Sequence, residues 1–269
     1  MQAQTMADRQ NDFDIPEAIA VAHLPGSLPM GGVVPDTPIH AFVRTPRALV
    51  FSATPRLSPT CTELDVAGPT AFVIRNVVTA DEADAIIKLT EHLGYRDEAP
   101  GINTPPGMRM NKTVHWLADD AMLSAIFKRI GALLPPTLDG RALHPQLSHR
   151  INMYRYDAND VFNRHIDGAW PAYSLNADRT RMQQWAGVSS MLTMILYLNG
   201  VEDGVIGGNT RLFARDGRVI DVTPKKGDAL FFRHGFGLDS VQHEGARVTS
   251  AVAKYVARIN VMYADPTAT

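Results

Sequence analysis

The feature that most constrains the fold is a succession of short strand-like segments that begins after Pro145. These segments are rich in β-branched and aromatic residues, and turn-forming glycine, asparagine or aspartate residues separate them. They span residues 148–156, 191–199, 210–214, 218–222, 229–233 and 247–263. Their spacing predicts an all-β sandwich or barrel in this part of the chain.

Two segments before this region have helical periodicity instead. Thr79 and Glu82 match a capping box, apolar residues then recur at helical spacing up to Leu93, and Gly94 supplies a stop. A second helix is predicted over residues 120–130. The predicted fold class is therefore mainly β, with helices packed outside a double-sheet core.

Prolines are dense in residues 1–69, which disfavours long helices and central strands there. We predict that this segment is an N-terminal extension, either an extended arm or a set of short edge strands, with its first dozen or so residues disordered. Residues 70–263 are predicted to form one domain, and residues 264–269 a C-terminal tail.

Composition limits the possible partners and compartment. A formal net charge of −2 gives no electrostatic argument for binding nucleic acid or an acidic membrane surface. No stretch approaches the roughly 18 apolar residues that span a bilayer, and the N-terminus lacks the pattern of a secretory signal. The one cysteine, Cys61, excludes an internal disulfide and a cysteine-rich metal site. The expectation is a cytoplasmic enzyme or binding protein.

The residues that can carry chemistry begin with a His-X-Asp sequence, His165 and Asp167. On an extended strand, side chains two positions apart point to the same face, so an imidazole and a carboxylate can reach one ion. A second histidine would complete a set of two histidines and one carboxylate, which suits oxygen-activating iron(II). His234 and His243 are the available choices, and His243 is favoured because a long predicted strand follows it.

Five ordered motifs around these residues resemble the prolyl 4-hydroxylase-like branch of the 2-oxoglutarate/iron(II) oxygenases. They lie at residues 152–156, 162–168, 196–213, 222–232 and 243–258. Together the resemblance covers about residues 71–263. It implies a double-stranded β-helix (jelly-roll or cupin-like) core and the cofactors Fe(II), 2-oxoglutarate and O2, with ascorbate as reductant.

The resemblance also assigns roles by position. His165, Asp167 and His243 take the metal-ligand places. Lys254 takes the place of the basic residue that binds the distal carboxylate of 2-oxoglutarate, and tyrosines that hydrogen-bond this cosubstrate correspond to Tyr156 and Tyr197. An intact carboxylate at position 167 favours hydroxylation or a related oxidation, because halogenating relatives have glycine or alanine there.

Two departures from the family pattern stand out. Lys254 follows His243 by eleven residues where the family usually has ten. A bulge could absorb the extra residue; otherwise the register would turn Lys254 to the opposite face, and Arg258 is then the reserve anchor. Asn209 also replaces the usual glutamate of a Gly-Gly-Glu-Thr turn.

The substrate is less constrained by the sequence. Candidate substrate residues are Arg109, Asn111, Trp170, Arg179 and Arg181. The last three lie in a long connection that is either a lid or a solvated loop. We favour hydroxylation, or another oxidation, of an unactivated C–H bond in a small polar metabolite or natural-product intermediate. The alternatives are a peptidyl substrate such as proline in a protein partner, and a non-catalytic β-barrel binding protein.

Overall fold

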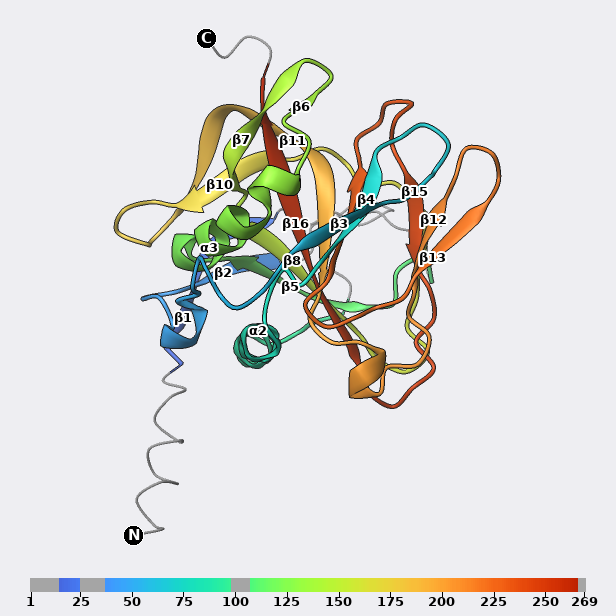
Figure 1. The fold of residues 1–269 in the computed structure, drawn as a ribbon. Coiled ribbons are helices and arrows are strands. Elements are labelled where there is room, and N and C mark those ends of the chain that lie inside the picture. Colours follow the sequence, from blue (N-terminus) through green and yellow to red (C-terminus); the bar gives the residue numbers. More distant parts are fainter. Residues whose placement is uncertain (1–14, 25–36, 98–106, 266–269) are drawn as a thin grey trace, which may run out of the picture.

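A computed structural model describes residues 15–24, 37–97 and 107–265 (Figure 1). The predicted disordered N-terminal residues and residues 266–269 of the predicted tail lie outside the described residues. Within the described ranges, no helix is both long and apolar enough to cross a membrane.

Two facing sheets form the core, and their central strands are antiparallel. The centre of the larger sheet consists of β8 (Arg150–Tyr156), β16 (Lys254–Ala264), β11 (Met182–Tyr197) and β14 (Ala229–Arg233), in that spatial order. The smaller sheet has the order β13 (Val219–Val222), β12 (Thr210–Phe213), β15 (Gln242–Gly245) and β9 (Phe162–His165). Apart from the β12–β13 hairpin, each of these strands is followed by one in the other sheet. This connectivity is a double-stranded β-helix, which confirms the predicted fold class.

The larger sheet continues beyond these central strands. At one edge lie β5 (Lys112–Leu117), β2 (Thr37–Phe42) and β1 (Ala18–Leu24), and at the other lie β4 (Ala71–Arg75) and β3 (Thr60–Glu63). Three more strands, β6 (Thr137–Leu138), β7 (Arg141–Leu147) and β10 (Pro171–Leu175), pair off this path. The described part of the proline-rich segment therefore extends the sheet at both edges.

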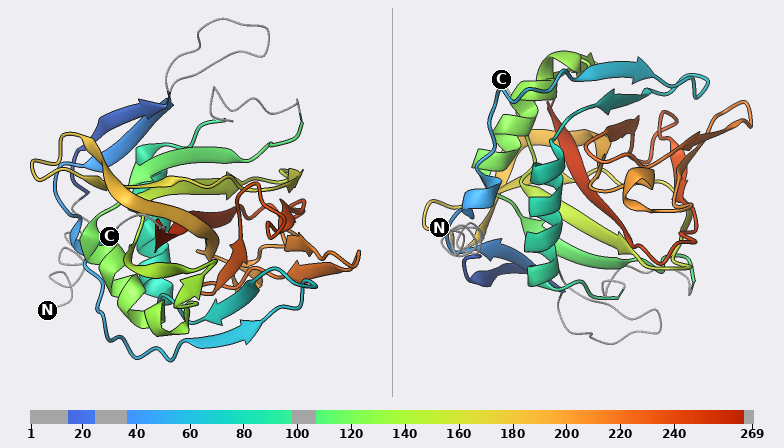
Figure 2. Two further views of the ribbon diagram at one scale, coloured as in Figure 1. Left: turned by 90° about the horizontal axis from the view of Figure 1, so that it is seen from above. Right: turned by 60° about the horizontal axis from the view of Figure 1, so that its bottom comes forward.

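Two helices cover the outer face of the larger sheet, opposite the smaller sheet (Figures 1 and 2). They are α2 (Ala80–Leu93) and α3 (Asp120–Ile130), at the predicted positions. The predicted capping box is present, because the Thr79 hydroxyl accepts from the Glu82 amide and the Glu82 carboxylate accepts from the Thr79 amide. Short 3-10 turns occur at Arg47–Leu49, Gly131–Leu133 and Val201–Asp203.

The alternation of side chains along the central strands creates two separate cores. On β11, Leu192 and Met194 pack outward beneath the helices, while Ile195 and Tyr197 point inward between the two sheets. Leu212 of the smaller sheet closes this inner core from the other side. The inner core, between the sheets, is the one that contains the candidate site.

Two predictions about the elements were wrong. The last strand begins at Lys254 and not at residue 247, because hydrogen bonds to Ile206 anchor a loop over residues 246–253. The Ile206 amide donates to the Ser250 hydroxyl, and the Thr249 amide donates to the Ile206 carbonyl. Residues 171–190, predicted to be a long connection before the strand at residue 191, instead form β10, a turn and the first part of β11, which pair as a hairpin. The sequence pattern did not indicate this hairpin. One strand, β11, is both the partner of β10 and a central strand of the larger sheet, and its first part is rich in polar and aromatic residues.

We expect Thr79→Ala to lower the free energy of unfolding by about 1 kcal/mol, because it leaves an amide at the start of α2 without its hydrogen bond. Urea denaturation measures this change. Thr79→Ser retains the capping hydroxyl and is the matched control. Equal stability of the two variants would show that the cap does not stabilise this helix.

Candidate active site

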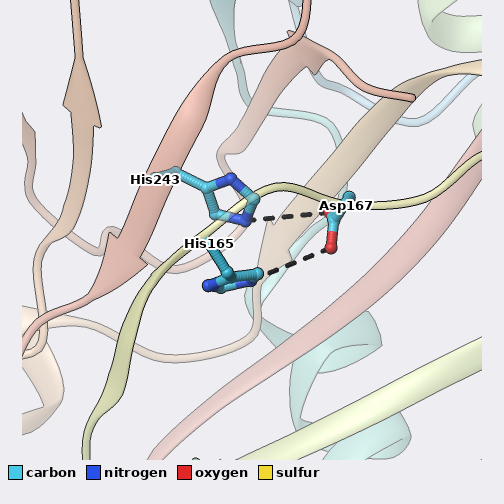
Figure 3. A group of neighbouring side chains, drawn as sticks. All are labelled: His165, Asp167 and His243. Carbon is cyan, nitrogen blue, oxygen red and sulfur yellow. Dashed lines mark ion pairs between the residues drawn. The ribbon is translucent and has the colours of Figure 1, made fainter. Parts of the chain in front are cut away.

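The candidate site is a cluster of two histidines and one aspartate between the sheets (Figure 3). His165 and His243 lie opposite each other on the paired strands β9 and β15, with ring centroids 4.2 Å apart. Asp167 follows the end of β9, and its two carboxylate oxygens lie 3.9 Å from His165 Nε2 and 3.7 Å from His243 Nε2. Donor atoms that are each roughly 2.1 Å from one ion can be at most roughly 4.2 Å apart. The spacing therefore fits a single metal ion.

The tautomers of both histidines suit metal binding. The backbone carbonyl of Asn163 lies 2.7 Å from His165 Nδ1, and that of Val241 lies 3.2 Å from His243 Nδ1. A carbonyl only accepts, so each Nδ1 carries the proton and each Nε2 keeps its lone pair. Burial lowers the pKa of His165 to about 3 and lowers that of His243 as well. Both imidazoles are therefore neutral at neutral pH, which is the form that binds a metal.

Asp167 stays ionised although it is buried. Burial opposes its ionisation, but the adjacent Arg258 guanidinium and the imidazoles hold its pKa well below the usual range. Its Oδ2 accepts from Arg258 Nε at 2.8 Å and from the Thr193 hydroxyl at 2.7 Å. These two donors occupy one carboxylate oxygen and leave Oδ1 available for an ion.

His234, the other candidate ligand, does not join the cluster. Its Nδ1 lies 2.8 Å from the Thr193 hydroxyl and its Nε2 lies 2.8 Å from the Ser190 hydroxyl. The Thr193 hydroxyl donates its hydrogen bond to Asp167, so the Thr193 oxygen accepts from His234 Nδ1. His234 Nε2 then accepts a hydrogen bond from the Ser190 hydroxyl. Both nitrogens of His234 are thus used, and the chain of bonds fixes the orientation of Asp167.

A cavity extends from this cluster into the inner core. His165, Asp167 and His243 are among the residues that line it. The rest of its lining consists of Tyr154, Tyr156, Phe162, Ile195, Thr210, Gly245, Lys254, Val256 and Arg258. One cavity therefore joins the candidate metal ligands to a buried lysine.

Lys254 is 1% exposed and has no acidic partner among the described residues. Its Nζ donates to the Gly208 carbonyl at 2.6 Å and lies 4.9 Å from the centre of the Tyr156 ring. Burial lowers the pKa of this amine to about 7. A buried amine without a counter-ion in the lining of a cavity is suited to binding an anion.

The residue that lengthens the step from His243 to Lys254 lies in the 246–253 loop, and no bulge in the strand is needed. Lys254 pairs with Tyr156 across the strands, and its side chain faces inward. The side chain of Arg258, four positions later, also faces inward. The turn above Lys254 needs glycine: Gly208 has a φ of +67°, and a Cβ there would lie 3.0 Å from the Lys254 side chain.

Sequence comparison agrees with this geometry. The family model described as "2OG-Fe(II) oxygenase superfamily" matches residues 151–262. Residues 151–262 form a 2OG-Fe(II) oxygenase domain. The chain is thus a 2-oxoglutarate-dependent dioxygenase, and its cofactors are Fe(II), 2-oxoglutarate and O2. The hypothesis of a non-catalytic binding protein is not supported.

Three similar solved structures are prolyl hydroxylases by title. A Pseudomonas putida prolyl-4-hydroxylase is 17% identical, with a TM-score of 0.47 over 75% of this chain and 95% of its own. The viral collagen prolyl hydroxylase of Paramecium Bursaria Chlorella virus-1, in complex with 2OG, is 18% identical, with a TM-score of 0.48 over 75% and 99%. A Trichoplax adhaerens prolyl hydroxylase bound to a hypoxia inducible factor peptide is 16% identical, with a TM-score of 0.49 over 72% and 83%. Identities and TM-scores this low assign no substrate. No curated protein sequence matches the chain.

The residues predicted to contact substrate lie in different places in the oxygenase. Arg109 is buried, and its guanidinium lies over the rings of the cavity residues Tyr154 and Phe162. Asn111 is buried beside its own strand and donates to the Lys112 carbonyl. Neither belongs to the lining of the cavity.

The three candidates in and next to the β10–β11 hairpin lie in different places. Trp170 lies beside the site, where its ring is 4.5 Å from the Arg150 guanidinium. Arg179 instead pairs with Asp119 at 2.6 Å and donates to the Phe42 carbonyl, so it holds the hairpin to the larger sheet. Arg181 is exposed at the hairpin turn. Neither Arg179 nor Arg181 lines the cavity.

Sequence reasoning missed several residues of the oxygenase site. Thr193, Thr210 and Arg150 all face the inner core. A signal for Arg150 was present, because it precedes Tyr156 by an even number of residues on a predicted strand and must share its face. The interaction between Thr193 and Asp167 joins residues far apart in sequence and had no local signal.

We expect the free energy of unfolding to fall as the pH is lowered from about 6.5 to about 4, in part because of His115. Burial and the neighbouring Arg150 lower the pKa of folded His115 to about 4. Unfolded His115 binds a proton below its ordinary pKa of 6.5, whereas folded His115 does not until about pH 4. The stabilisation is thus complete above pH 6.5 and is lost as the pH falls.

Urea denaturation of His115→Gln across this range tests the expectation. Its loss of stability should be smaller than that of the unmodified protein by up to about 3 kcal/mol. His92→Gln, at an exposed position on α2, should keep the original pH dependence. Parallel curves for His115→Gln and the unmodified protein would contradict the role of His115.

Proposed function

We propose that His165, Asp167 and His243 hold the iron(II) of this dioxygenase. Two neutral imidazoles and one ionised carboxylate match the ligand set of oxygen-activating iron(II), and the ligand atoms all lie within 4.8 Å of one another. Arg258 and Thr193 hold the carboxylate, and the Asn163 and Val241 carbonyls orient the imidazoles.

We further propose that 2-oxoglutarate lies along the cavity and that Lys254 binds its distal carboxylate. The observation that carries the proposal is that one cavity is lined both by the candidate metal ligands and by Lys254, whose amine has no acidic partner among the described residues. Thr210 lines the same cavity and accepts a hydrogen bond from Tyr197 at 2.9 Å. Tyr197 thus acts through Thr210, while Tyr156 lies in the cavity wall. Arg258 is engaged with Asp167, so Lys254 is the better anchor.

When bound, iron and 2-oxoglutarate would supply the oxidation: one oxygen atom of O2 would enter succinate, formed with CO2 from 2-oxoglutarate, and the other would be inserted into a substrate C–H bond as hydroxyl. The protein contributes position and exclusion of water. The apolar side chains of Ile195 and Val256 also line the cavity and help to exclude water from it.

We propose a small polar metabolite as the substrate. The β10–β11 hairpin places Trp170 and Pro171 over a small chamber next to Arg258, so the site is covered on that side. The segment after β14 supports a second candidate, a peptidyl substrate. Its Gly235 amide donates to the Asp167 carbonyl, and its Phe236 and Leu238 are 85% and 93% exposed. Exposed apolar side chains beside a site are typical of protein-contact surfaces.

Succinate release from 2-oxoglutarate, with iron(II) and O2 present, tests the activity across panels of metabolites and proline-containing peptides. We expect turnover that a metabolite increases more than any peptide, and we expect His243→Ala to abolish both turnover and stoichiometric iron binding. His234→Gln should still bind iron, weakened by about 10–100-fold, because it only orients Asp167. Absence of succinate from an iron-loaded protein, or intact iron binding in His243→Ala, would refute the assignment.

We expect the affinity for 2-oxoglutarate to fall as the pH rises above about 7. The Lys254 amine must be protonated to bind a carboxylate strongly, and burial lowers its pKa to about 7 before the ligand binds. Below that pH the charged form is already present; above it, binding must take up a proton. Calorimetry over a pH series should show a decline that approaches about tenfold per pH unit.

The Lys254→Met variant tests whether Lys254 causes this decline of affinity with pH. Its affinity for 2-oxoglutarate should be about 10–100-fold lower at neutral pH, because one charge-assisted hydrogen bond is lost. This affinity should not depend on pH in the same range. Arg258→Met, which leaves Lys254 in place, should retain the decline with pH. If Lys254→Met binds 2-oxoglutarate as the unmodified protein does, the anchor lies elsewhere.

A further inference from the structure

A second chamber adjoins the cavity and shares one wall with it. Its lining residues are Arg150, Asn152, Trp170, Pro171, Arg258 and Asn260. Arg258 separates it from the main cavity, since this side chain lines both spaces. The chamber therefore lies one side chain away from Asp167, close to where a substrate must meet the iron.

Arg150 is a buried cation without a counter-ion. It is 8% exposed, its Nε has no hydrogen-bond partner, and it forms no ion pair within the described part of the chain. Its guanidinium lies 4.5 Å from the centre of the Trp170 ring and 5.9 Å from that of Tyr173. Aromatic faces offset a small part of the lost hydration, and a buried guanidinium stays protonated. Its charge is thus present and largely uncompensated.

Arg258 adds a second positive charge to the same chamber. Its Nε pairs with Asp167, but its Nη2 is buried without a partner. The Arg258 charge is one reason, after burial, that the pKa of Arg150 is lowered, which shows that the two guanidinium groups interact. The chamber therefore contains two buried guanidiniums but only one carboxylate partner, Asp167, which pairs with Arg258 and also faces the two histidines. The chamber is left with an excess of positive charge.

The chamber also offers a hydrogen-bond acceptor. Asn260 Oδ1 is buried without a partner, whereas Asn152 Oδ1 is occupied by His115 Nδ1 at 2.9 Å. A ligand that satisfies the orphan atoms must accept hydrogen bonds from two guanidiniums and donate one to an amide oxygen. A carboxylate with a hydroxyl or amine on a neighbouring carbon has this pattern, and planar carboxylates match guanidinium geometry.

We propose that this chamber binds the carboxylate of a small-molecule substrate, with Arg150 and Arg258 as its donors. The oxygenase would then act on a small amino or hydroxy acid, held by its acid group while a C–H bond further along is presented to the iron. The inference rests on the proposed function, because it takes the part of the cavity lined by His165, Asp167 and His243 as the reaction site. A mid-chain peptidyl proline carries no free carboxylate and does not fit.

The proposal separates binding from stability in one variant. A residue that only supports the fold destabilises the protein when it is replaced. Arg150→Met keeps the length of the side chain and removes an uncompensated buried charge. We expect its melting temperature without ligand to equal or exceed that of the unmodified protein, while it loses affinity for the acid.

The binding experiment uses full-length protein loaded with redox-inert Zn²⁺ and saturated with 2-oxoglutarate, so that the main cavity is filled. The probes are small amino, hydroxy and aromatic acids, each paired with its primary amide, together with inorganic phosphate. Calorimetry and tryptophan fluorescence, which senses Trp170, measure binding. We expect at least one acid to bind at least about tenfold more tightly than its amide, and Arg150→Met to weaken that acid by about tenfold or more.

Arg181→Met makes the same chemical change at an exposed position of the neighbouring hairpin and should bind the acid normally. The proposal is overturned if no acid is preferred to its amide, if phosphate binds more tightly than every acid, or if Arg150→Met binds the acid unchanged. A lower melting temperature of Arg150→Met than of Arg181→Met also counts against it. Succinate release without substrate and Lys254-dependent binding of 2-oxoglutarate, measured on the same preparations, show whether the proposed function itself still holds.

Discussion

The buried carboxylate of Asp167 is the group on which the rest of the site depends. It bridges the two sheets, because it follows a strand of the smaller sheet and accepts hydrogen bonds from Arg258 and Thr193 of the larger one. A charged carboxylate is costly inside a protein unless it is paired and hydrogen-bonded. These donors keep it ionised and fix one of its oxygens, so the other can face the two histidines in the orientation that an iron ion requires.

Positive charge is distributed through the inner core at intervals that follow the strands. Lys254 and Arg258 lie four positions apart on β16, and Arg150 lies on the neighbouring strand β8. Of these three side chains, only Arg258 has an acidic partner among the described residues. Lys254 and Arg150 are buried and each present a charge that a ligand can neutralise. In the proposed function these two positions separate the cosubstrate from the substrate: one carboxylate binds on each side of the iron.

Much of the site could be predicted because its residues lie in locally recognisable patterns. The pair His165 and Asp167 follows from strand spacing, and Lys254 follows from the motif after His243. The extra residue before Lys254 could not be placed from the sequence. Whether it shifts a strand or lengthens a loop depends on hydrogen bonds between the 246–253 loop and Ile206, which lies about 40 residues earlier.

The sequence by itself determined the double-sheet core, both helices with their limits, and the residue types that can hold iron, because these depend on local periodicity and short spacing. Only the tertiary structure decided between His234 and His243. Both are buried, but the pairing of β9 with β15 brings His243 opposite His165, while Ser190 and Thr193 occupy both nitrogens of His234. Only the tertiary structure also showed that Arg150 lacks a counter-ion, since a missing partner is a property of everything packed around a side chain and not of its neighbours in sequence.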